Sequence, residues 1–188
     1  MSFPKDEEKN LFSNIERMLY TEQQVHDRVA ELGRQISADY SGKPLVLISI
    51  LKGGIIFLAD LSRAITIPHS FDVMGASSYK GTRSTGKVII TKDVELDIRG
   101  RDILLVEDIL DSGKTLTMVI ELLKIQDPAS VNICCLLHKK RDNQLNIPLR
   151  YTGFEIPDEY VVGYGLDFNE EYRNLAGIGV LKPEIYLD

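Results

Sequence analysis

The stretch Asp102–Leu116, with the sequence DILLVEDILDSGKTL, decides the fold and carries the strongest chemical signal. An apolar run of strand length leads into the adjacent carboxylates Glu107 and Asp108. A third acid, Asp111, then precedes a small, hydroxyl-rich turn that opens an amphipathic helix, expected over Thr115 to Ile125. Strand, turn and helix in this order predict the first half of a βαβ unit.

The turn between this strand and this helix has the composition of a phosphate cradle. Backbone N–H groups at the start of a helix have no partner within it and point toward any anion lodged there. Gly113 has no Cβ to keep a phosphate oxygen away, and Ser112 and Thr115 add hydroxyl donors. We therefore predict that Ser112, Gly113, Lys114 and Thr115 bind a phosphate group.

The three acids need a separate explanation, because carboxylates repel phosphate unless they bind something else. Glu107 and Asp108 suit ribose hydroxyls or a divalent cation, whereas Asp111, next to the turn, suits a proton in transfer. Two other interpretations explain less. The tripeptide at 113–115 resembles the end of a Walker A loop, but the first glycine of that motif would fall at Asp108. An ordinary junction with a capping serine leaves three acids within five positions unexplained.

Strand and helix signals alternate along the rest of the chain. Thr21 and Gln24 predict a capping box, followed by a helical stripe of apolar residues that ends before Ser41. Leu45 to Leu51 is the continuous apolar run of a strand buried on both faces of a parallel sheet. The pattern predicts an α/β domain with a doubly wound, mainly parallel sheet flanked by helices, and ligands at the carboxyl ends of its strands. The stripe is Val25, Val29, Leu32 and Ile36; the other expected elements are a helix over Ile55 to Ile65 and strands over Phe71 to Tyr79, Lys87 to Thr91, Ile103 to Val106 and Val131 to Leu137.

Composition sets limits on the class of protein. A chain of 188 residues, 44% hydrophobic and 27% charged, fits a single domain over residues 1–188. The net charge of −6 argues against nucleic acid or an acidic membrane as a partner. The apolar runs are too short to span a bilayer, and residues 1–10 lack a signal-peptide core, so we expect a cytoplasmic protein. Cys134 and Cys135 are adjacent in a strand and should point to opposite faces, as apolar fillers.

Three further segments carry polar or glycine-rich patterns. Leu51-Lys52-Gly53-Gly54 ends a buried strand with two glycines and a cation, which suits an anion, although a plain turn would also fit. The loop from Ser77 to Gly86 has small residues and a basic pair, as expected of a mobile cover or of an exposed hairpin connection. The basic run His138 to Arg141 follows a strand, where a lysine could bind a ligand or simply face solvent.

These motifs, taken in order, identify a family resemblance. The segment from Val106 to Thr115 resembles the binding motif for phosphoribosyl pyrophosphate (PRPP) of the type I phosphoribosyltransferases, in the form found in their 6-oxopurine salvage branch. The resemblance extends from about Leu45 to about Leu181 and includes the segment Phe154 to Phe168. It implies a core over about 45–140 and a small base-binding hood built from the N-terminal segment and about 150–188.

The resemblance also implies a role for each matching residue. Asp111 would be the catalytic general base for the N7 proton of the purine, and Lys139 would donate a hydrogen bond to the 6-oxo group. Tyr160 would stack on the base, with Val161 and Asp167 beside it. Lys52, Gly53 and Arg173 would bind pyrophosphate, with a cis peptide between Leu51 and Lys52, and Ser78 and Tyr79 would lie on a closing lid. Mg²⁺ would be held by Glu107, Asp108 and Asp167.

The implied activity is purine salvage. The 5-phosphoribosyl group of PRPP would pass to N9 of hypoxanthine or guanine, giving IMP or GMP and pyrophosphate, in a homodimer or homotetramer. Two alternatives remain open at this point: a relative that prefers xanthine, and a regulator on the same fold that senses PRPP or nucleotides without turnover. The acidic balance and the presence of every motif argue against the regulator.

Overall fold

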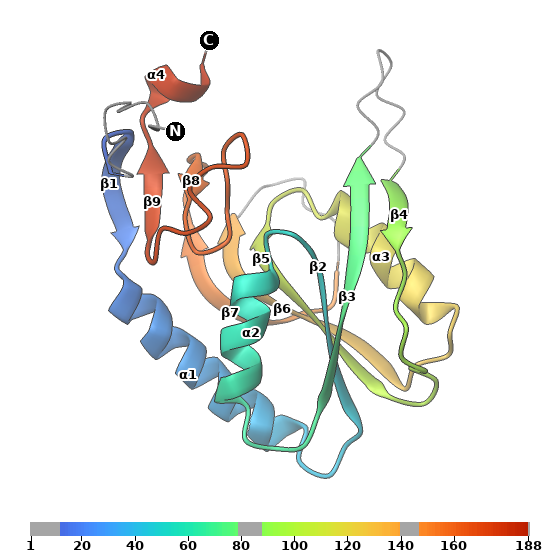
Figure 1. Ribbon diagram of the computed structural model, residues 1–188. Coiled ribbons are helices and arrows are strands. Elements are labelled where there is room, and N and C mark those ends of the chain that lie inside the picture. The colour runs from blue at the N-terminus through green and yellow to red at the C-terminus, as the bar shows by residue number, and fades with distance from the viewer. Residues whose placement is uncertain (1–11, 79–87, 140–146, 188) are drawn as a thin grey trace, which may run out of the picture.

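The computed structural model describes residues 12–78, 88–139 and 147–187, and Figure 1 shows how their helices and strands are arranged. In chain order the elements are β1 (Ile15–Tyr20), α1 (Glu22–Asp39), β2 (Leu45–Leu51), α2 (Ile55–Ala64), β3 (Ser70–Ser78), β4 (Val88–Lys92), β5 (Asp102–Leu110), α3 (Lys114–Lys124), β6 (Ser130–Lys139), β7 (Leu149–Ile156), β8 (Val161–Val162), β9 (Ile178–Leu181) and α4 (Pro183–Tyr186).

The main sheet has six strands in the order β4-β3-β2-β5-β6-β7. Strands β3, β2, β5, β6 and β7 run parallel, and β4 pairs antiparallel to β3 at the edge. Helix α2 connects β2 to β3 on one face and helix α3 connects β5 to β6 on the other, which confirms the predicted doubly wound α/β fold.

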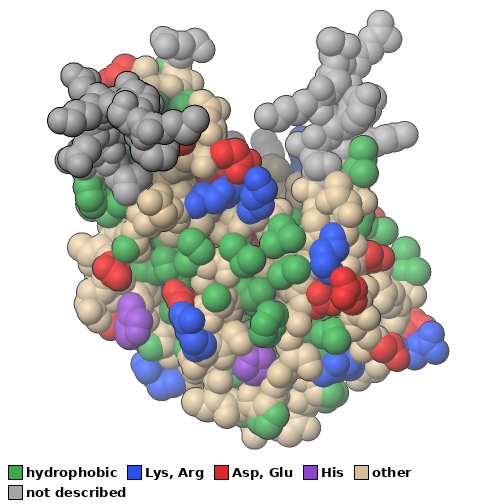
Figure 2. Space-filling model, viewed as in Figure 1, with side chains coloured by type: hydrophobic (Ala, Val, Ile, Leu, Met, Phe, Trp, Pro, Cys, Tyr) green, Lys and Arg blue, Asp and Glu red, His purple; other side chains and the backbone are tan. Residues whose placement is uncertain are grey.

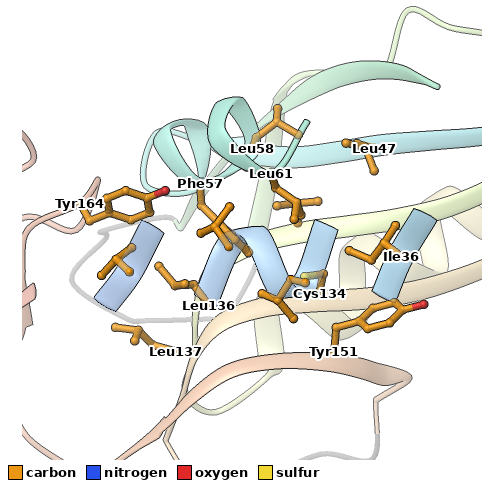
Figure 3. Close-up of a cluster of buried hydrophobic side chains, with 14 of the residues drawn as sticks. Ile36, Leu47, Phe57, Leu58, Leu61, Cys134, Leu136, Leu137, Tyr151 and Tyr164 are labelled. Carbon is orange, nitrogen blue, oxygen red and sulfur yellow. The ribbon is translucent and has the colours of Figure 1, made fainter. Parts of the chain in front are cut away.

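Helices cover both faces of this sheet, and this explains why the sequences of its central strands are continuously apolar. Helices α1 and α2 pack on one face, where Figure 3 shows α2 side chains such as Phe57 and Leu61 against Leu47 and Leu136 of the sheet. Helix α3 covers the other face through side chains that include Val119 and Leu123. Because neither face meets water, β2 needs no polar alternation and its first six residues are buried.

The two cysteines lie on opposite faces of β6, as predicted. Cys134 belongs to the cluster under α1 and α2, and Cys135 to the cluster under α3. Both are fully buried, and burial raises the pKa of each thiol above its ordinary value. They fill the core as small apolar side chains.

The predicted start of the first long helix is confirmed in detail. Thr21 is the N-cap of α1, and its hydroxyl accepts a hydrogen bond from Gln24 N at 3.3 Å. The Gln24 side chain accepts one in return from Thr21 N at 2.9 Å, which completes the capping box. All four residues of the predicted apolar stripe are buried against the sheet.

The junction between β5 and α3 differs from the prediction. The strand continues to Leu110, because its ladder with β6 runs on to the pair of Leu110 with His138. Glu107 and Asp108 therefore lie within the strand and not after it. The helix begins at Lys114, and its N-cap is Gly113 in the left-handed conformation, with φ of 77° and no side-chain cap. The alternative of an ordinary junction with a capping serine is therefore wrong, because the cap is a glycine in the left-handed region.

A second, three-stranded antiparallel sheet in the order β1-β9-β8 lies beside the carboxyl ends of the main sheet. It joins the N-terminal part of the described chain to the C-terminal part, as the resemblance implies for a hood. Strand β7 falls in the range expected for this hood but pairs with β6 in the main sheet. In the described part of the chain we find no helix with the length and hydropathy needed to cross a membrane.

Candidate active site

The predicted site residues gather where β2, β5 and β6 end. Leu110 of β5 lies opposite His138 of β6, so Asp111 and Lys139 follow neighbouring positions on adjacent strands. Lys52 and Gly53 follow the end of β2, the strand on the other side of β5. The carboxyl ends of parallel strands lie at the same edge of a sheet, which explains why residues far apart in sequence lie close together here.

The turn after β5 lines a cavity of about 230 Å³. The first helical hydrogen bond of α3 runs from Thr117 N to Gly113 O at 2.9 Å. The backbone N–H groups of the preceding turn come before that bond, which leaves them for a ligand or for local contacts. Lys114 N makes one such contact, at 3.5 Å, to the hydroxyl of Ser112. The cavity is lined by Ile50, Glu107, Ile109, Leu110, Asp111, Ser112, Gly113, Lys114, Thr115 and Leu116.

Glu107 and Asp108 have different surroundings although they are neighbours. The Glu107 side chain is buried and accepts a hydrogen bond from Ile50 N at 3.0 Å, which ties β5 to β2. Burial, and then the charge of Asp108, raises the pKa of Glu107 well above its ordinary value. Asp108 accepts a hydrogen bond from Ile109 N at 2.8 Å, and burial raises its pKa to about 6.

These two carboxylates fit a divalent cation. Hard oxygen donors suit Mg²⁺, and a cation would offset the cost of ionising two partly or fully buried acids side by side. Among the described residues, no three His, Cys, Asp or Glu side chains are arranged to hold a metal ion. Mg²⁺ commonly binds through one or two carboxylates together with substrate phosphates and water, and that is the arrangement this donor set suits.

The loop after β2 has the predicted close backbone approach. The peptide bond between Leu51 and Lys52 is cis, as the resemblance implies. A Cβ at Gly53 would collide with the carboxylate of Asp108, and a Cβ at Gly54 would collide with the hydroxyl of Ser49. Without Cβ atoms at these two glycines, the loop lies closely against β5 and β2.

The predicted base-binding residues lie at the end of β6 and at the start of β8. The Lys139 side chain is 12% exposed, and its Nζ lies 3.4 Å from Asp158. The Tyr160 ring stacks on that of Tyr186 with centroids 4.9 Å apart, and it meets the edge of Phe168 at 5.6 Å. Val161 is buried and pairs with Val180 in the small sheet.

A network of charges joins the loop after β2 to the loop between β8 and β9. Arg173 Nη2 lies 2.9 Å from Asp167 and 3.3 Å from Glu170, and Lys52 Nζ lies 3.0 Å from the same Glu170 oxygen. Arg173 Nη1 also donates to Gly165 O at 2.7 Å. The hydrogen bond from Lys52, followed by that from Arg173, lowers the pKa of Glu170.

Two predicted lid residues lie partly or wholly outside the described part of the chain, and three residues with contacts at the site were not predicted. Ser78 is the last residue of β3, but its side chain and the whole of Tyr79 lie outside the described residues. Sequence reasoning missed Glu170, Asp158 and Tyr186. The spacing of Asp167, Glu170 and Arg173 by three residues was the only local signal for Glu170. Asp158 and Tyr186 carry no such signal, because their partners are distant in sequence.

Comparison with known proteins assigns this chain to a family. Residues 17–169 match the family model described as the phosphoribosyl transferase domain. The chain belongs to the phosphoribosyltransferase family. The resemblance deduced from the motifs is confirmed, and this phosphoribosyltransferase is an enzyme of the transferase class.

Relatives of this phosphoribosyltransferase carry names from the 6-oxopurine branch. The hypoxanthine-guanine phosphoribosyltransferase of Mycobacterium bovis is 46% identical over 180 residues, which cover 92% of this chain and 89% of the relative. The hypoxanthine phosphoribosyltransferase of Salmonella typhimurium is 47% identical over 165 residues, covering 86% and 93%. A crystal structure of a hypoxanthine phosphoribosyltransferase from Staphylococcus aureus superposes with a TM-score of 0.90 at 44% identity, covering 96% of this chain and 99% of that one.

Proposed function

We propose that this phosphoribosyltransferase salvages purines by transferring the 5-phosphoribosyl group of PRPP to N9 of hypoxanthine or guanine. The products are IMP or GMP and pyrophosphate. The names of its relatives support this substrate class. The observation that carries the proposal is the register of β5 and β6, which sets Asp111, the phosphate turn and Lys139 at one edge of the sheet.

Different residues at this edge of the sheet bind the 5′-phosphate, the pyrophosphate group and the purine. The 5′-phosphate binds in the turn of Ser112 to Thr115, where backbone N–H groups and hydroxyls meet a helix start. Lys52 and Arg173 bind the pyrophosphate group from two sides, Arg173 in the planar geometry that a guanidinium favours. The purine stacks on Tyr160, and Lys139 donates to its 6-oxo group.

The transfer reaction breaks one bond at C1′ of the sugar and forms another. The C1′–oxygen bond to pyrophosphate breaks while N9 of the purine bonds to C1′, and charge develops on the sugar ring. Asp111 takes the N7 proton of the purine in the forward direction and returns it in the reverse direction. Pyrophosphate leaves between Lys52 and Arg173, whose positive charges stabilise it.

The cofactor proposed for this reaction is Mg²⁺. Glu107, Asp108 and Asp167 would hold the ion or ions together with substrate oxygens. When bound, Mg²⁺ neutralises negative charge on the departing pyrophosphate. The buried position of Glu107 and its bond to Ile50 N also assign it a structural role between β5 and β2.

Base selectivity tests the proposal most directly. A 6-amino group offers no acceptor for the Lys139 ammonium, so adenine would lack the hydrogen bond that a 6-oxo group accepts, at a cost of roughly 10⁴ in specificity. Release of pyrophosphate from PRPP should be measured with hypoxanthine, guanine, xanthine and adenine in turn. We expect turnover with hypoxanthine or guanine and almost none with adenine.

A matched pair of variants sharpens the measurement. Lys139→Ala should lose most of the preference for hypoxanthine over adenine, whereas Lys124→Ala removes the same charge from the exposed end of α3 and should keep it. Equal rates with adenine and hypoxanthine in the wild type would refute the base assignment. Binding of PRPP without turnover of any purine would favour the regulator, and a preference for xanthine would favour the other alternative.

Two further expectations accompany the proposal. A cytoplasmic location and a homodimeric or homotetrameric state stay predictions from sequence and family resemblance. We expect the contact between subunits on the apolar face of α2 and β3, which includes the exposed side chains of Ile55 and Phe71.

A further inference from the structure

One carboxylate oxygen joins the two cations to which the proposed function assigns pyrophosphate. Glu170 Oε2 lies 3.0 Å from Lys52 Nζ and 3.3 Å from Arg173 Nη2. Lys52 follows β2, whereas Glu170 and Arg173 lie in the loop between β8 and β9. An anion thus already stands between the cations of two separate segments.

The loop backbone holds Glu170 in this place. Asn169, Glu170 and Tyr172 have φ of 52°, 66° and 73°, the left-handed region that favours glycine. Residues with side chains keep such angles only where their surroundings impose them, and here Glu170 N donates to Asp167 Oδ2 at 3.0 Å. A two-way backbone pairing of Phe168 with Glu171, at 3.3 and 3.0 Å, closes the same turn.

The bridge is open to replacement by a ligand. The Lys52 and Glu170 side chains are 67% and 65% exposed, so water and a polyanion can reach both. Arg173 is 24% exposed and keeps its contacts with Asp167 and Gly165 O when Glu170 leaves. Pyrophosphate carries more charge and more acceptor oxygens than one carboxylate, so it competes well for the same two cations.

We propose that Glu170 is a built-in stand-in for pyrophosphate, which bridges Lys52 and Arg173 in the empty enzyme and is displaced when PRPP binds. Glu170 acts through these two cations, so it is a positioning residue. It lowers the affinity for the pyrophosphate group and thereby speeds its release after transfer. This inference rests on the proposed function, since it takes Lys52 and Arg173 as the pyrophosphate ligands.

The test compares pyrophosphate binding by two variants of neighbouring glutamates. Glu170→Gln removes the bridging charge and keeps the side-chain size. Glu171→Gln removes the same charge one residue away, from an exposed side chain for which no ion pair is found among the described residues. Titration calorimetry with pyrophosphate and Mg²⁺ gives the dissociation constants, and circular dichroism checks the fold of each variant.

We expect Glu170→Gln to bind pyrophosphate about two- to fivefold more tightly than Glu171→Gln, the range of a lost exposed ion pair. The KM of Glu170→Gln for PRPP should fall together with its dissociation constant for pyrophosphate. Its kcat should stay level or fall, because pyrophosphate leaves more slowly. In a Lys52→Gln background, the tightening by Glu170→Gln should shrink, because one arm of the bridge is already gone.

Equal or weaker pyrophosphate binding by Glu170→Gln relative to Glu171→Gln would overturn the inference. An undiminished effect of Glu170→Gln in the Lys52→Gln background would overturn it as well. Failure of the proposed function gives a different result, in which the wild type neither binds pyrophosphate with Mg²⁺ nor turns over PRPP with hypoxanthine.

Discussion

At the scale of residues, three acids within five positions of the chain have three different environments. Glu107 is buried within β5 and bonded to Ile50 N. Asp108 lies against the loop of Gly53. Asp111 lies beyond the strand and lines the cavity of the phosphate turn. Environment decides how a carboxyl group titrates and what it can do, so the three can serve three purposes.

The proposed role of Asp111 predicts a loss of turnover without a loss of fold. Asp111→Asn keeps the side-chain shape beyond the end of β5 but cannot take a proton. A positioned general base contributes about 10²–10⁴-fold, so kcat should fall within that range. Steady-state kinetics with PRPP and hypoxanthine measures it, with Asp27→Asn on the exposed side of α1 as control. Wild-type turnover in Asp111→Asn would remove this residue from the base role.

The raised pKa of Asp108 predicts a pH-dependent stability. The folded protein binds this proton more tightly than the unfolded chain, so the contribution is fully present below the ordinary pKa and is lost as pH rises through about 6. Asp108→Asn should therefore raise the free energy of unfolding by about 1–3 kcal/mol at pH 8 and by little at pH 4. Chemical denaturation of the ligand-free protein at both pH values measures the difference. A gain that is the same at both would contradict this assignment.

At the scale of elements, the loop after β2 and the loop after β8 pack backbone to backbone. Gly165 has φ of 100°, and a Cβ there would collide with the carbonyl oxygen of Gly53. Gly165 N also donates to Arg173 O at 3.0 Å. The two segments that carry Lys52 and Arg173 are therefore held at a fixed separation by a glycine.

This packing predicts that Gly165→Ala weakens PRPP binding in addition to stability. Gly100→Ala is a matched control, since Gly100 also has a positive φ, of 68°, but nothing lies within 4 Å of its added Cβ. Left-handed strain alone costs about 1–2 kcal/mol, which both variants share. Only Gly165→Ala should raise the KM for PRPP, by about tenfold, equivalent to about 1.4 kcal/mol. Thermal melts and kinetics separate the two effects, and an unchanged KM would contradict the argument.

The sequence predicted most elements to within a few residues, because apolar runs and capping residues act locally. Thr21 and Gln24 form their capping box within one turn of α1. The end of β5 was missed because its ladder with β6 decides it, and no local pattern reports that pairing. Likewise a buried Glu107 inside a strand is possible only because Ile50 N, 57 positions away, supplies its partner.

At the scale of the whole molecule, the site draws on both ends of the described chain. Strand β1 pairs with β9, and Arg17 of β1 forms an ion pair with Glu159, next to Tyr160. The motifs predicted residues that the fold brings to the carboxyl ends of the strands, since each motif is contiguous. Contacts such as Lys139 with Asp158 and Tyr160 with Tyr186 could not be predicted, because they arise only when separate elements pack.

One face of the molecule is apolar and exposed. Figure 2 shows hydrophobic side chains gathered on the face where α2 and β3 lie. Ile55 and Phe71 are 45% and 61% exposed there, and they line a cavity of about 250 Å³ with Leu58 and Val73. Contiguous exposed apolar surface is typical of protein interfaces, which supports the expected homo-oligomer.

We therefore expect Phe71→Glu to lower the oligomeric state. A charge at the centre of an apolar contact would be desolvated without a partner, which destabilises association. Light scattering after size-exclusion chromatography measures the molar mass. Ile125→Glu is the control, since Ile125 is 76% exposed at the end of α3. A monomeric wild type, or an unchanged mass for Phe71→Glu, would contradict this expectation.

The placement of the two sulfur atoms in β6 has a practical consequence. Cys134 and Cys135 are the only cysteines of the chain, and each is sealed beneath a different helical layer. Iodoacetamide needs an accessible thiolate, so native enzyme should resist alkylation. During unfolding, the rate of alkylation of each cysteine, followed by mass spectrometry, would then report when the helical layer above it opens. No engineered probe is needed.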